Sequence, residues 1–279
     1  MNPATCRVAT LEVSDGTPRR ADDTVVTEEP LEIRALFAGT RFPVAVTMRT
    51  PGADFELAAG FLYNEGLVKG QDDLRRLSYC AEGPQRYNIV NVELAGAVDA
   101  SALAPLERHF SMTSACGVCG KATAETLRQR GCQPVGPGPQ LAAEVLSSLP
   151  AKLRDAQKLF GTTGGLHAAG LFSPDGELVA AREDVGRHNA LDKVVGWALM
   201  AGRLPLTGHV MLVSGRASFE LVQKSLSAGV AALCSVSAPS SLAVDLAREF
   251  SLTLACFVRP GRFKLYSAPE RVFPSATAW

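Results

Sequence analysis

The sequence predicts an α/β protein, with a mixed C-terminal sheet joined by crossover helices and a smaller N-terminal α+β region. The main observation is that helical and strand-like segments after residue 140 follow the order α-β-β-α-β-α-β-α-β. Strands that alternate with helices in this way form parallel sheets. The second observation is a cluster of glycines and prolines at 133–139, which separates this regular half from a strand-rich first half.

Composition limits the classes of function to consider. The chain has 279 residues, 47% of them hydrophobic, with 28 basic and 28 acidic residues. With this balance, the chain as a whole has no net positive charge to attract nucleic acid or an anionic membrane. No run reaches the roughly 18 apolar residues of a membrane span. Seven cysteines, an odd number, do not resemble a secreted disulfide framework. The N-terminus lacks the apolar segment of a signal peptide, so we expect a cytoplasmic protein.

The first third predicts strands and one helix. Leu31–Phe37 alternates apolar and polar residues, a turn follows, and Pro43–Arg49 returns as its hairpin partner. After a second turn, Asp54 is expected to cap a helix over Phe55–Asn64. Two more strands are predicted, at Arg76–Cys80 and Tyr87–Leu94.

These patterns divide the chain into four parts. We expect a polar tail at 1–25 that need not be ordered, an α+β region at 26–105, a connecting segment with two cysteines at 106–138, and an α/β domain at 139–279. Because the first two strands of that domain form a hairpin, their order favours a cytidine-deaminase-like fold over a Rossmann fold. The elements predicted there are helices over Leu141–Phe160, Gly186–Met200, Phe219–Ala228 and Leu242–Phe250, and strands over Leu166–Phe172, Glu177–Arg182, His209–Val213, Ala231–Val236 and Leu252–Val258.

The segment with the most reactive side chains is Cys116-Gly117-Val118-Cys119-Gly120-Lys121. Its two thiols lie three positions apart, just before a stretch of helix-forming residues. A helix N-terminus and a nearby cation such as Lys121 both lower a thiol pKa from its usual value of about 8.5. The residues before Cys116 are mostly small and polar, so the pair is predicted to lie on a mobile loop. Two such thiols can bind a metal, cycle through a disulfide or carry sulfur.

These three uses place different demands on the rest of the chain. A structural zinc takes four ligands, and the sequence has neither a second Cys-x-x-Cys nor a His-x-x-x-His. A thioredoxin-type pair follows a hydrophobic strand, whereas a polar segment precedes this one. We therefore predict a reactive-thiol loop without a structural metal. Two incidental buried cysteines are the plain alternative, which the glycines and the polar flank disfavour.

Three strand ends in the last third predict a binding site for an anionic, nucleotide-sized ligand. Ligands of open α/β sheets lie beyond the carboxyl ends of the parallel strands, where strand-to-helix turns offer free backbone N–H groups. Any one such turn is more often an ordinary capped turn, but three at neighbouring strands favour a site. The residues expected around this crevice are Ser214 and Arg216 in the first exit, Ser237 and Ser240 in the second, and Phe257, Val258, Arg259, Pro260, Gly261 and Arg262 in the third.

A charged run before the predicted helix at 186 has two interpretations. Arg187 and His188 could point into a cleft, with Asp184 orienting His188. Alternatively the run is a solvated helix cap, in which Asp184 or Asn189 accepts from free N–H groups and His188 pairs with Asp192 four residues on.

His167, on the first strand of this half, invites comparison with zinc deaminases. Those enzymes use His-x-Glu followed by Pro-Cys-x-x-Cys. Here Ala169 occupies the glutamate position and the second motif is absent, so deamination is excluded. His167 is either a packed strand histidine or a ligand contact.

Together these motifs resemble the formate dehydrogenase accessory sulfurtransferases of the FdhD type. The resemblance runs from about Leu31 to Ser267 and rests on CGVCGK, GTTGGLHAAGLFSPDGELVAAREDVGRHNALDKVVG (161–196), SGRASFELVQK (214–224), SAPSSLAVDLA (237–247) and FVRPGRFKLYS (257–267).

The resemblance implies a cytoplasmic sulfur carrier with a deaminase-like fold. It would accept persulfide sulfur from a cysteine desulfurase and deliver it to the molybdenum of bis-molybdopterin guanine dinucleotide (Mo-bis-MGD), on its way into formate dehydrogenase. Cys116 would carry the persulfide, Cys119 would assist, and Phe257–Arg262 would bind the cofactor. Guanine nucleotides such as GDP would mimic the cofactor ends, and the protein would be a homodimer.

Two other classes of function stay open. One is a metal- or redox-responsive binding module that uses Cys116 and Cys119. The other is a nucleotide-binding chaperone that escorts the cofactor without transferring sulfur.

Overall fold

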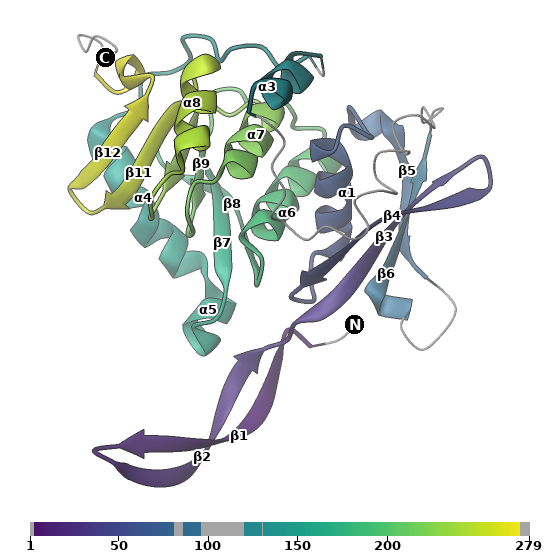
Figure 1. Ribbon diagram of the computed structural model, residues 1–279, viewed down its shortest axis with the longest axis vertical. Helices are drawn as coiled ribbons and strands as arrows, with labels where there is room; N and C mark the ends of the chain where they lie inside the picture. The colour runs from purple at the N-terminus through teal and green to yellow at the C-terminus, as the bar shows by residue number, and fades with distance from the viewer. Residues whose placement is uncertain (1–2, 81–85, 96–119, 130, 274–279) are drawn as a thin grey trace.

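The computed structural model describes residues 3–80, 86–95, 120–129 and 131–273, and shows a mixed α/β protein (Figure 1). Its strands are β1 Thr5–Ser14, β2 Thr17–Val26, β3 Glu29–Phe37, β4 Thr40–Arg49, β5 Leu74–Tyr79, β6 Ile89–Leu94, β7 His167–Phe172, β8 Leu178–Asp184, β9 Val210–Val213, β10 Ala232–Ser235, β11 Thr253–Arg259 and β12 Arg262–Ser267. Its helices are α1 Asp54–Asn64, α3 Gly120–Gln129, α4 Ala143–Ala156, α5 Lys158–Thr163, α6 Arg187–Met200, α7 Phe219–Ala228 and α8 Ser241–Glu249.

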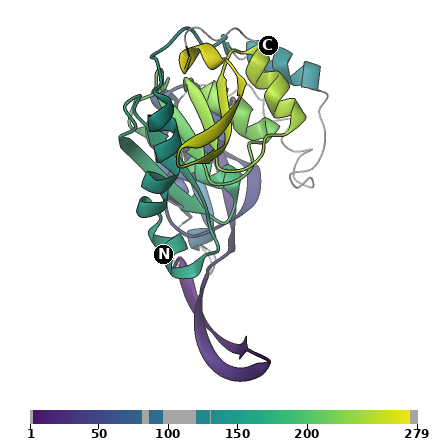
Figure 2. The same cartoon turned by 90° about the vertical axis from the view of Figure 1, so that its left-hand side faces the viewer.

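The largest sheet has six strands in the order β12-β11-β10-β9-β7-β8. β9, β10 and β11 are parallel, whereas β7, β8 and β12 each run antiparallel to a neighbour. Helices cover both faces, as Figure 2 shows. Alternate residues of β9 therefore enter different cores: Val210 and Leu212 join the core beneath α4, and Met211 and Val213 join the core beneath α6, α7 and α8. This explains the unbroken apolar run of that strand.

The predicted order of elements in this half is confirmed, with two differences. The helix expected over Leu141–Phe160 is interrupted at Gln157 and continues as α5. β12 was not predicted, and it makes the segment after β11 a hairpin turn, whereas the first two exits are the strand-to-helix turns that were expected. The hairpin of β7 and β8 and the parallel β9 to β11 agree with the expected strand order, while the specific likeness to cytidine deaminases and the domain boundaries stay predictions.

The second sheet has four strands in the order β4-β3-β6-β5 and packs one face on α1. The expected hairpin and the two later strands are present. Asp54 does not cap the helix as expected, because the N-cap is Ala53 with a left-handed φ of 53°. The carboxylate of Asp54 instead accepts from the Arg49 guanidinium at 3.1 and 3.2 Å, and Arg49 is almost fully buried.

The two halves meet where α1 crosses α6, and glycine makes this contact possible. A Cβ on Gly60 would lie 1.9 Å from the carbonyl oxygen of Asp192, and one on Gly196 would lie 1.8 Å from that of Glu56. The helices therefore touch backbone to backbone. Beside the crossing, the Asp192 carboxylate accepts from Lys224 at 2.6 and 2.7 Å and from Asn64 at 2.6 Å.

Residues 5–26 form a two-stranded ribbon of β1 and β2 that projects from the body (Figure 1). Asp15 and Gly16 form the turn with φ of 50° and 76°, as an Asp-Gly hairpin turn requires. The segment expected as a polar tail is therefore largely polar and exposed, and it is ordered as two paired strands.

Candidate functional site

One edge of the six-stranded sheet collects the predicted site residues. Strand directions place the carboxyl ends of β8, β9, β10 and β11 at the same edge as the first residues of β7 and β12. This edge, here called the carboxyl edge, therefore joins the three predicted strand exits to His167 and to the start of α6. Residues that are far apart in the chain meet there.

The first two exits are bonded to each other. The Ala217 N–H donates to Ala238 O at 3.1 Å, and the Ser240 N–H donates to Ala217 O at 3.0 Å. The buried Ser235 hydroxyl donates to Gly215 O at 2.6 Å and accepts from the Ser237 N–H at 3.0 Å. These bonds fix the turns but occupy backbone N–H groups that the sequence assigned to an anion. Side chains must therefore supply a larger part of any anion site than expected.

Ser214 and Ser240 have local structural tasks as well. The Ser214 hydroxyl accepts from the Ala168 N–H at 2.9 Å, which ties the first exit to β7. Ser240 is the N-cap of α8, where its hydroxyl accepts from the Ala243 N–H at 3.3 Å. Both serines lie at the carboxyl edge, and both hold its backbone in place.

The third exit joins the second through Phe257 and Arg259. The Phe257 N–H donates to Ser237 O at 3.1 Å, and the Arg259 guanidinium donates to Val236 O at 2.6 Å. The register between β11 and β12 shifts between Cys256 and Arg259, and Phe257 has a left-handed φ of 55° with its side chain 37% exposed. A strained backbone that presents an aromatic ring to solvent is a recognised mark of functional sites.

The predicted arginines are only partly brought together. Arg259 and Arg262 are register partners across the hairpin. Arg216 follows β9, which lies two strands from β11 and three from β12, or about 10 to 15 Å across the sheet. Arg216 and Arg262 are exposed, as are Pro260 and Gly261 in the hairpin turn. The arrangement is an exposed row of positive charge along the carboxyl edge.

Arg187 and His167 complete the edge beside the first exit. A Cβ on Gly215 would lie 3.3 Å from Nδ1 of His167 and 3.4 Å from Cδ of Arg187, so the three residues are packed together. Nδ1 of His167 also lies 3.4 Å from the Ser214 hydroxyl. Nε of Arg187 is buried, and it has no hydrogen-bond partner among the residues that the structure describes. Because buried polar atoms nearly always have partners, this N–H is a candidate contact for a ligand oxygen.

Burial is the main reason that the pKa of His167 lies below its ordinary value, and the positive charges of Arg187 and His188 lower that pKa further. A lower pKa favours the neutral form of the imidazole. A neutral ring can donate or accept a hydrogen bond without adding charge. His167 is packed against Gly215 and Ser214, and its role as a ligand contact stays a prediction.

His188 is oriented by a residue that the sequence analysis missed. Its Nε2 lies 2.9 Å from a carboxylate oxygen of Glu220 and 3.3 Å from the Ser218 hydroxyl. The hydrogen bond from His188 lowers the pKa of Glu220, against the opposing effect of burial. Glu220 follows the first exit in the SGRASFELVQK segment, but a contact across 32 positions leaves no local sequence signal.

The expected roles of Asp184 and Asp192 toward His188 were wrong. Asp184 is fully buried and accepts from the Gly186 N–H at 2.8 Å, from Asn189 at 3.0 Å and from Lys193 at 2.7 Å. Asp192 is held by Lys224 and Asn64, as described above. Asp184 therefore shapes the turn before α6, as the helix-cap interpretation proposed, while Arg187 and His188 lie at the carboxyl edge.

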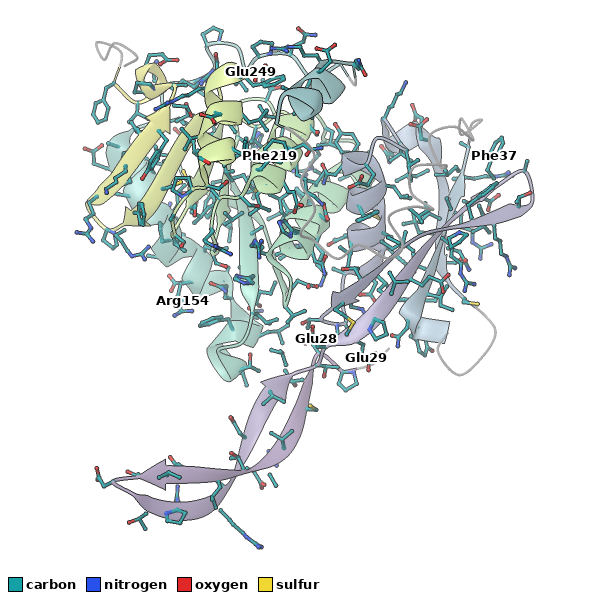
Figure 3. The ribbon with its side chains drawn as sticks, in the orientation of Figure 1. Glu28, Glu29, Phe37, Arg154, Phe219 and Glu249 are labelled. Atoms are coloured by element: carbon teal, nitrogen blue, oxygen red, sulfur yellow. The ribbon has the colours of Figure 1, made fainter. Side chains whose placement is uncertain are left out.

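Cys116 and Cys119 lie outside the described residues, which resume at Gly120 with α3. Leu127 of α3 is fully buried in the core, and Arg128 forms an ion pair with Glu249, the last residue of α8. Glu249 is nine residues from the N-cap of α8 at the carboxyl edge, or about 13.5 Å along the helix. Figure 3 shows Glu249 beside α3 and distant from the start of α7 at Phe219. The helix that follows the cysteine pair is thus anchored toward the opposite edge of the sheet.

Two other cysteines are poorly suited to nucleophilic chemistry. Cys234 and Cys256 are fully buried, and burial raises both pKa values, that of Cys256 to about 12. A thiol of this kind stays protonated at neutral pH and is a poor nucleophile. Cys6 is exposed on the ribbon, and Cys80 and Cys132 are half-buried.

Neither a metal cluster nor a membrane span is visible in the described part of the chain. No group of three or more histidine, cysteine or acidic side chains there is arranged to hold a metal ion. None of the helices it contains is long and apolar enough to cross a bilayer.

The fold and this edge define a mixed α/β protein that gathers arginine, histidine and serine side chains at its strand ends. The model of the FdhD/NarQ family matches residues 26–273, and the chain belongs to this family. Proteins named sulfur carrier protein FdhD are close relatives: that of Streptomyces coelicolor is 49% identical over 98% of this chain and 97% of its own length. The protein of this name from Mycobacterium tuberculosis is 50% identical over 90% of this chain and 92% of its own length. The one from Sulfurisphaera tokodaii is 41% identical over 95% of this chain and 98% of its own length.

A solved structure shares the fold. The crystal structure of a candidate formate dehydrogenase accessory protein from Desulfotalea psychrophila superposes with a TM-score of 0.75. It covers 97% of this chain and 100% of its own, at 24% sequence identity. At this level of identity the comparison supports the arrangement of sheets and helices.

Proposed function

We propose that this protein is a cytoplasmic sulfur carrier that takes persulfide sulfur from a cysteine desulfurase and delivers it to Mo-bis-MGD before that cofactor enters formate dehydrogenase. The observation that carries the proposal is the Cys116-x-x-Cys119 pair in a chain 49% identical to a protein named a sulfur carrier. The proposal includes a homodimer, as the family resemblance implies.

Cys116 is the proposed carrier. Its thiolate attacks the outer sulfur of the desulfurase persulfide, the sulfur–sulfur bond of the donor breaks, and the donor cysteine leaves as a thiolate. The outer sulfur is then bonded to Cys116, with no net oxidation of the pair of proteins. The glycines on either side, and the cation and helix N-terminus that follow, favour the thiolate that this step requires.

Cys119 is the proposed assisting thiol in delivery. Its thiolate attacks the inner sulfur of the Cys116 persulfide, which forms a Cys116–Cys119 disulfide and releases the carried sulfur as hydrosulfide to the bound cofactor. The two cysteines supply the two electrons that reduce the carried sulfur. A cellular dithiol reductant then returns the pair to its reduced form.

The carboxyl edge is the proposed site for the guanosine diphosphate ends of the cofactor. Arg259, Arg262 and Arg216 offer charge for the phosphates, and Phe257 offers an exposed ring to stack on a base. Arg187 offers a buried N–H that has no partner among the described residues. GDP is the soluble mimic of these ends.

Maturation of formate dehydrogenase in cells that lack the endogenous carrier tests the role of the thiols. Cys116→Ser is expected to abolish formate dehydrogenase activity, while Cys119→Ser reduces it less, since an external thiol can replace an assisting one. Cys234→Ser is the matched control, because that thiol is buried and protonated. Full activity with Cys116→Ser would contradict the proposal.

Two measurements separate the other classes of function. Elemental analysis that finds about one zinc per chain, lost in Cys116→Ser, would favour the metal-responsive module. GDP binding together with normal maturation by Cys116→Ser would favour a chaperone that escorts the cofactor without transferring sulfur.

A further inference from the structure

The projecting ribbon has an open edge along β2. Within the described residues β2 pairs with β1 alone, over ten residues from Thr5↔Val26 to Ser14↔Thr17. An isolated two-stranded ribbon is marginally stable in water, and an open edge is a template for another strand. Figure 3 shows the ribbon extending from its base at Glu28, with no other element against its outer half.

The charges along β2 are self-complementary. The strand reads Arg19-Arg20-Ala21-Asp22-Asp23, two cations and two anions on either side of a small neutral residue. In an antiparallel pairing with the β2 of a second copy, centred on Ala21, Arg20 faces Asp22 and Arg19 faces Asp23 of that copy. The two-fold axis repeats both pairs. Opposite charges directly across an antiparallel pair stabilise it, and like charges destabilise it.

The backbone of β2 fits the same register. The Thr27 N–H donates to Ala4 O at 2.9 Å in the register of the ribbon, so odd-numbered residues of β2 bond to β1 and even-numbered residues point their N–H and C=O outward. Arg20 and Asp22 are both even-numbered, and they are partners in the proposed pairing. Pro18 is also even-numbered and lacks an N–H, so the pairing has one backbone hydrogen bond fewer at each of the two positions where Pro18 faces Thr24.

The exposed apolar residues of the ribbon lie beside this edge. Leu11 is 59% and Val13 63% exposed, and their cross-strand partners are Arg20 and Pro18. Partners across a pair share one face of a sheet, so Leu11 and Val13 lie on the face that carries Arg20 and Asp22. Pairing of two ribbons would make that face four strands wide.

We propose that β2 pairs antiparallel with β2 of a second copy of this chain, so that two ribbons form one four-stranded sheet with its two-fold axis at Ala21. The occupant is a second copy rather than a different protein, because both the charge pattern and the hydrogen-bonding parity match under the same two-fold operation. This pairing is independent of the proposed sulfur chemistry and gives the homodimer a specific contact.

Charge exchange tests the pairing in the full-length protein. The variants are R19D/R20D, D22R/D23R and the fourfold exchange R19D/R20D/D22R/D23R, compared by sedimentation velocity over a range of concentrations. Each double variant is expected to self-associate at least about tenfold more weakly than wild type, because all four facing pairs become like-charged. An equimolar mixture of the two double variants forms a mixed dimer, and the fourfold variant, which restores opposite pairs, dimerises again.

Several outcomes would overturn this pairing. They are a monomeric wild type, unchanged dimerisation of the double variants, and a fourfold variant as weak as the doubles. The last would show that a different protein, or another part of this chain, occupies the edge. Circular dichroism and thermal melting check that the variants keep the fold, which is expected because the exchanged side chains lie on the ribbon.

Cross-linking provides a second readout that does not depend on charge. In a Cys6→Ser background, Ala21→Cys is expected to form a reducible dimer on mild oxidation, because position 21 faces itself across the axis. Thr17→Cys is the matched control, since its facing residue is Val25 and the same cross-link cannot form. Equal cross-linking of both variants, or of neither, contradicts the register.

Discussion

Charged residues gather both at the crossing of α1 and α6 and at the carboxyl edge. They are buried and paired at the crossing, but exposed or unpaired within the described residues at the edge. At the crossing, Asp192, Lys224 and Asn64 are buried and bonded to one another, within a few residues of the contact between Gly60 and Gly196. At the carboxyl edge, Arg216 and Arg262 are exposed, and a buried N–H of Arg187 has no partner among the described residues. Paired charge at the crossing holds the fold together, whereas available charge at the edge is suited to a ligand.

The largest expected loss of unfolding free energy comes from removing one member of the buried Asp192–Lys224 pair. Asp192→Asn leaves the Lys224 ammonium without a carboxylate at the crossing, and loss of one partner of a buried pair costs about 3–5 kcal/mol of unfolding free energy. Urea unfolding measures this change. Glu12→Gln, which removes an exposed ion pair with Arg19, is the control and should change the unfolding free energy by less than about 1 kcal/mol. Equal effects of the two variants would contradict the structural role of the crossing.

A smaller loss of unfolding free energy is expected when a side chain is added at the glycine contact between α1 and α6. Gly196→Ala places a Cβ where the Glu56 carbonyl lies, so the helices must separate, and overpacking of this kind costs about 1–3 kcal/mol. Gly161→Ala is the matched control, since the added Cβ meets no atom within 4 Å beyond its chain neighbours and the backbone of its own helix. If urea unfolding gives both alanine variants the stability of wild type, the helices do not touch as described.

At the carboxyl edge the expected change is in binding rather than stability. Arg187→Gln should weaken GDP binding roughly tenfold, since a charged hydrogen bond contributes about 1.5–3 kcal/mol. Its unfolding free energy should stay within about 1 kcal/mol of wild type. Arg75→Gln removes the same charge from the other sheet and should leave affinity unchanged. Calorimetry that finds equal affinities for wild type and Arg187→Gln would remove Arg187 from the site.

The smallest expected effect concerns pH. The folded state lowers the pKa of His167, so the unfolded chain takes up a proton first as the pH falls below about 6.5. Stability attributable to His167 is therefore present above that pH and is lost progressively toward the lower folded-state pKa. His167→Gln should lose less unfolding free energy than wild type between pH 7.5 and 5.5. Parallel pH dependence in both proteins would show that His167 does not titrate differently on folding.

These two regions also show what the sequence can and cannot predict. The ends of β9, β10 and β11 were predicted because apolar strands and polar turns alternate clearly, and strand direction then fixes their common edge. The link between His188 and Glu220 was not predicted, because it joins residues 32 positions apart through space. The loss of free N–H groups to bonds between Ala217, Ala238 and Ser240 is likewise a tertiary effect. β12 was missed because charged residues, Arg262 and Lys264, occupy its exposed positions.

The most direct test of the central claim is mass spectrometry of Cys116 after incubation of the protein with a cysteine desulfurase and cysteine. The account predicts an added mass of one sulfur on Cys116, removed by reductant and absent in Cys116→Ser. Arg262→Ala should carry the same persulfide while binding GDP roughly ten- to a hundredfold more weakly, because loading and cofactor capture use separate parts of the chain. A protein that gains no sulfur on Cys116 under conditions in which the desulfurase itself is loaded would contradict the account.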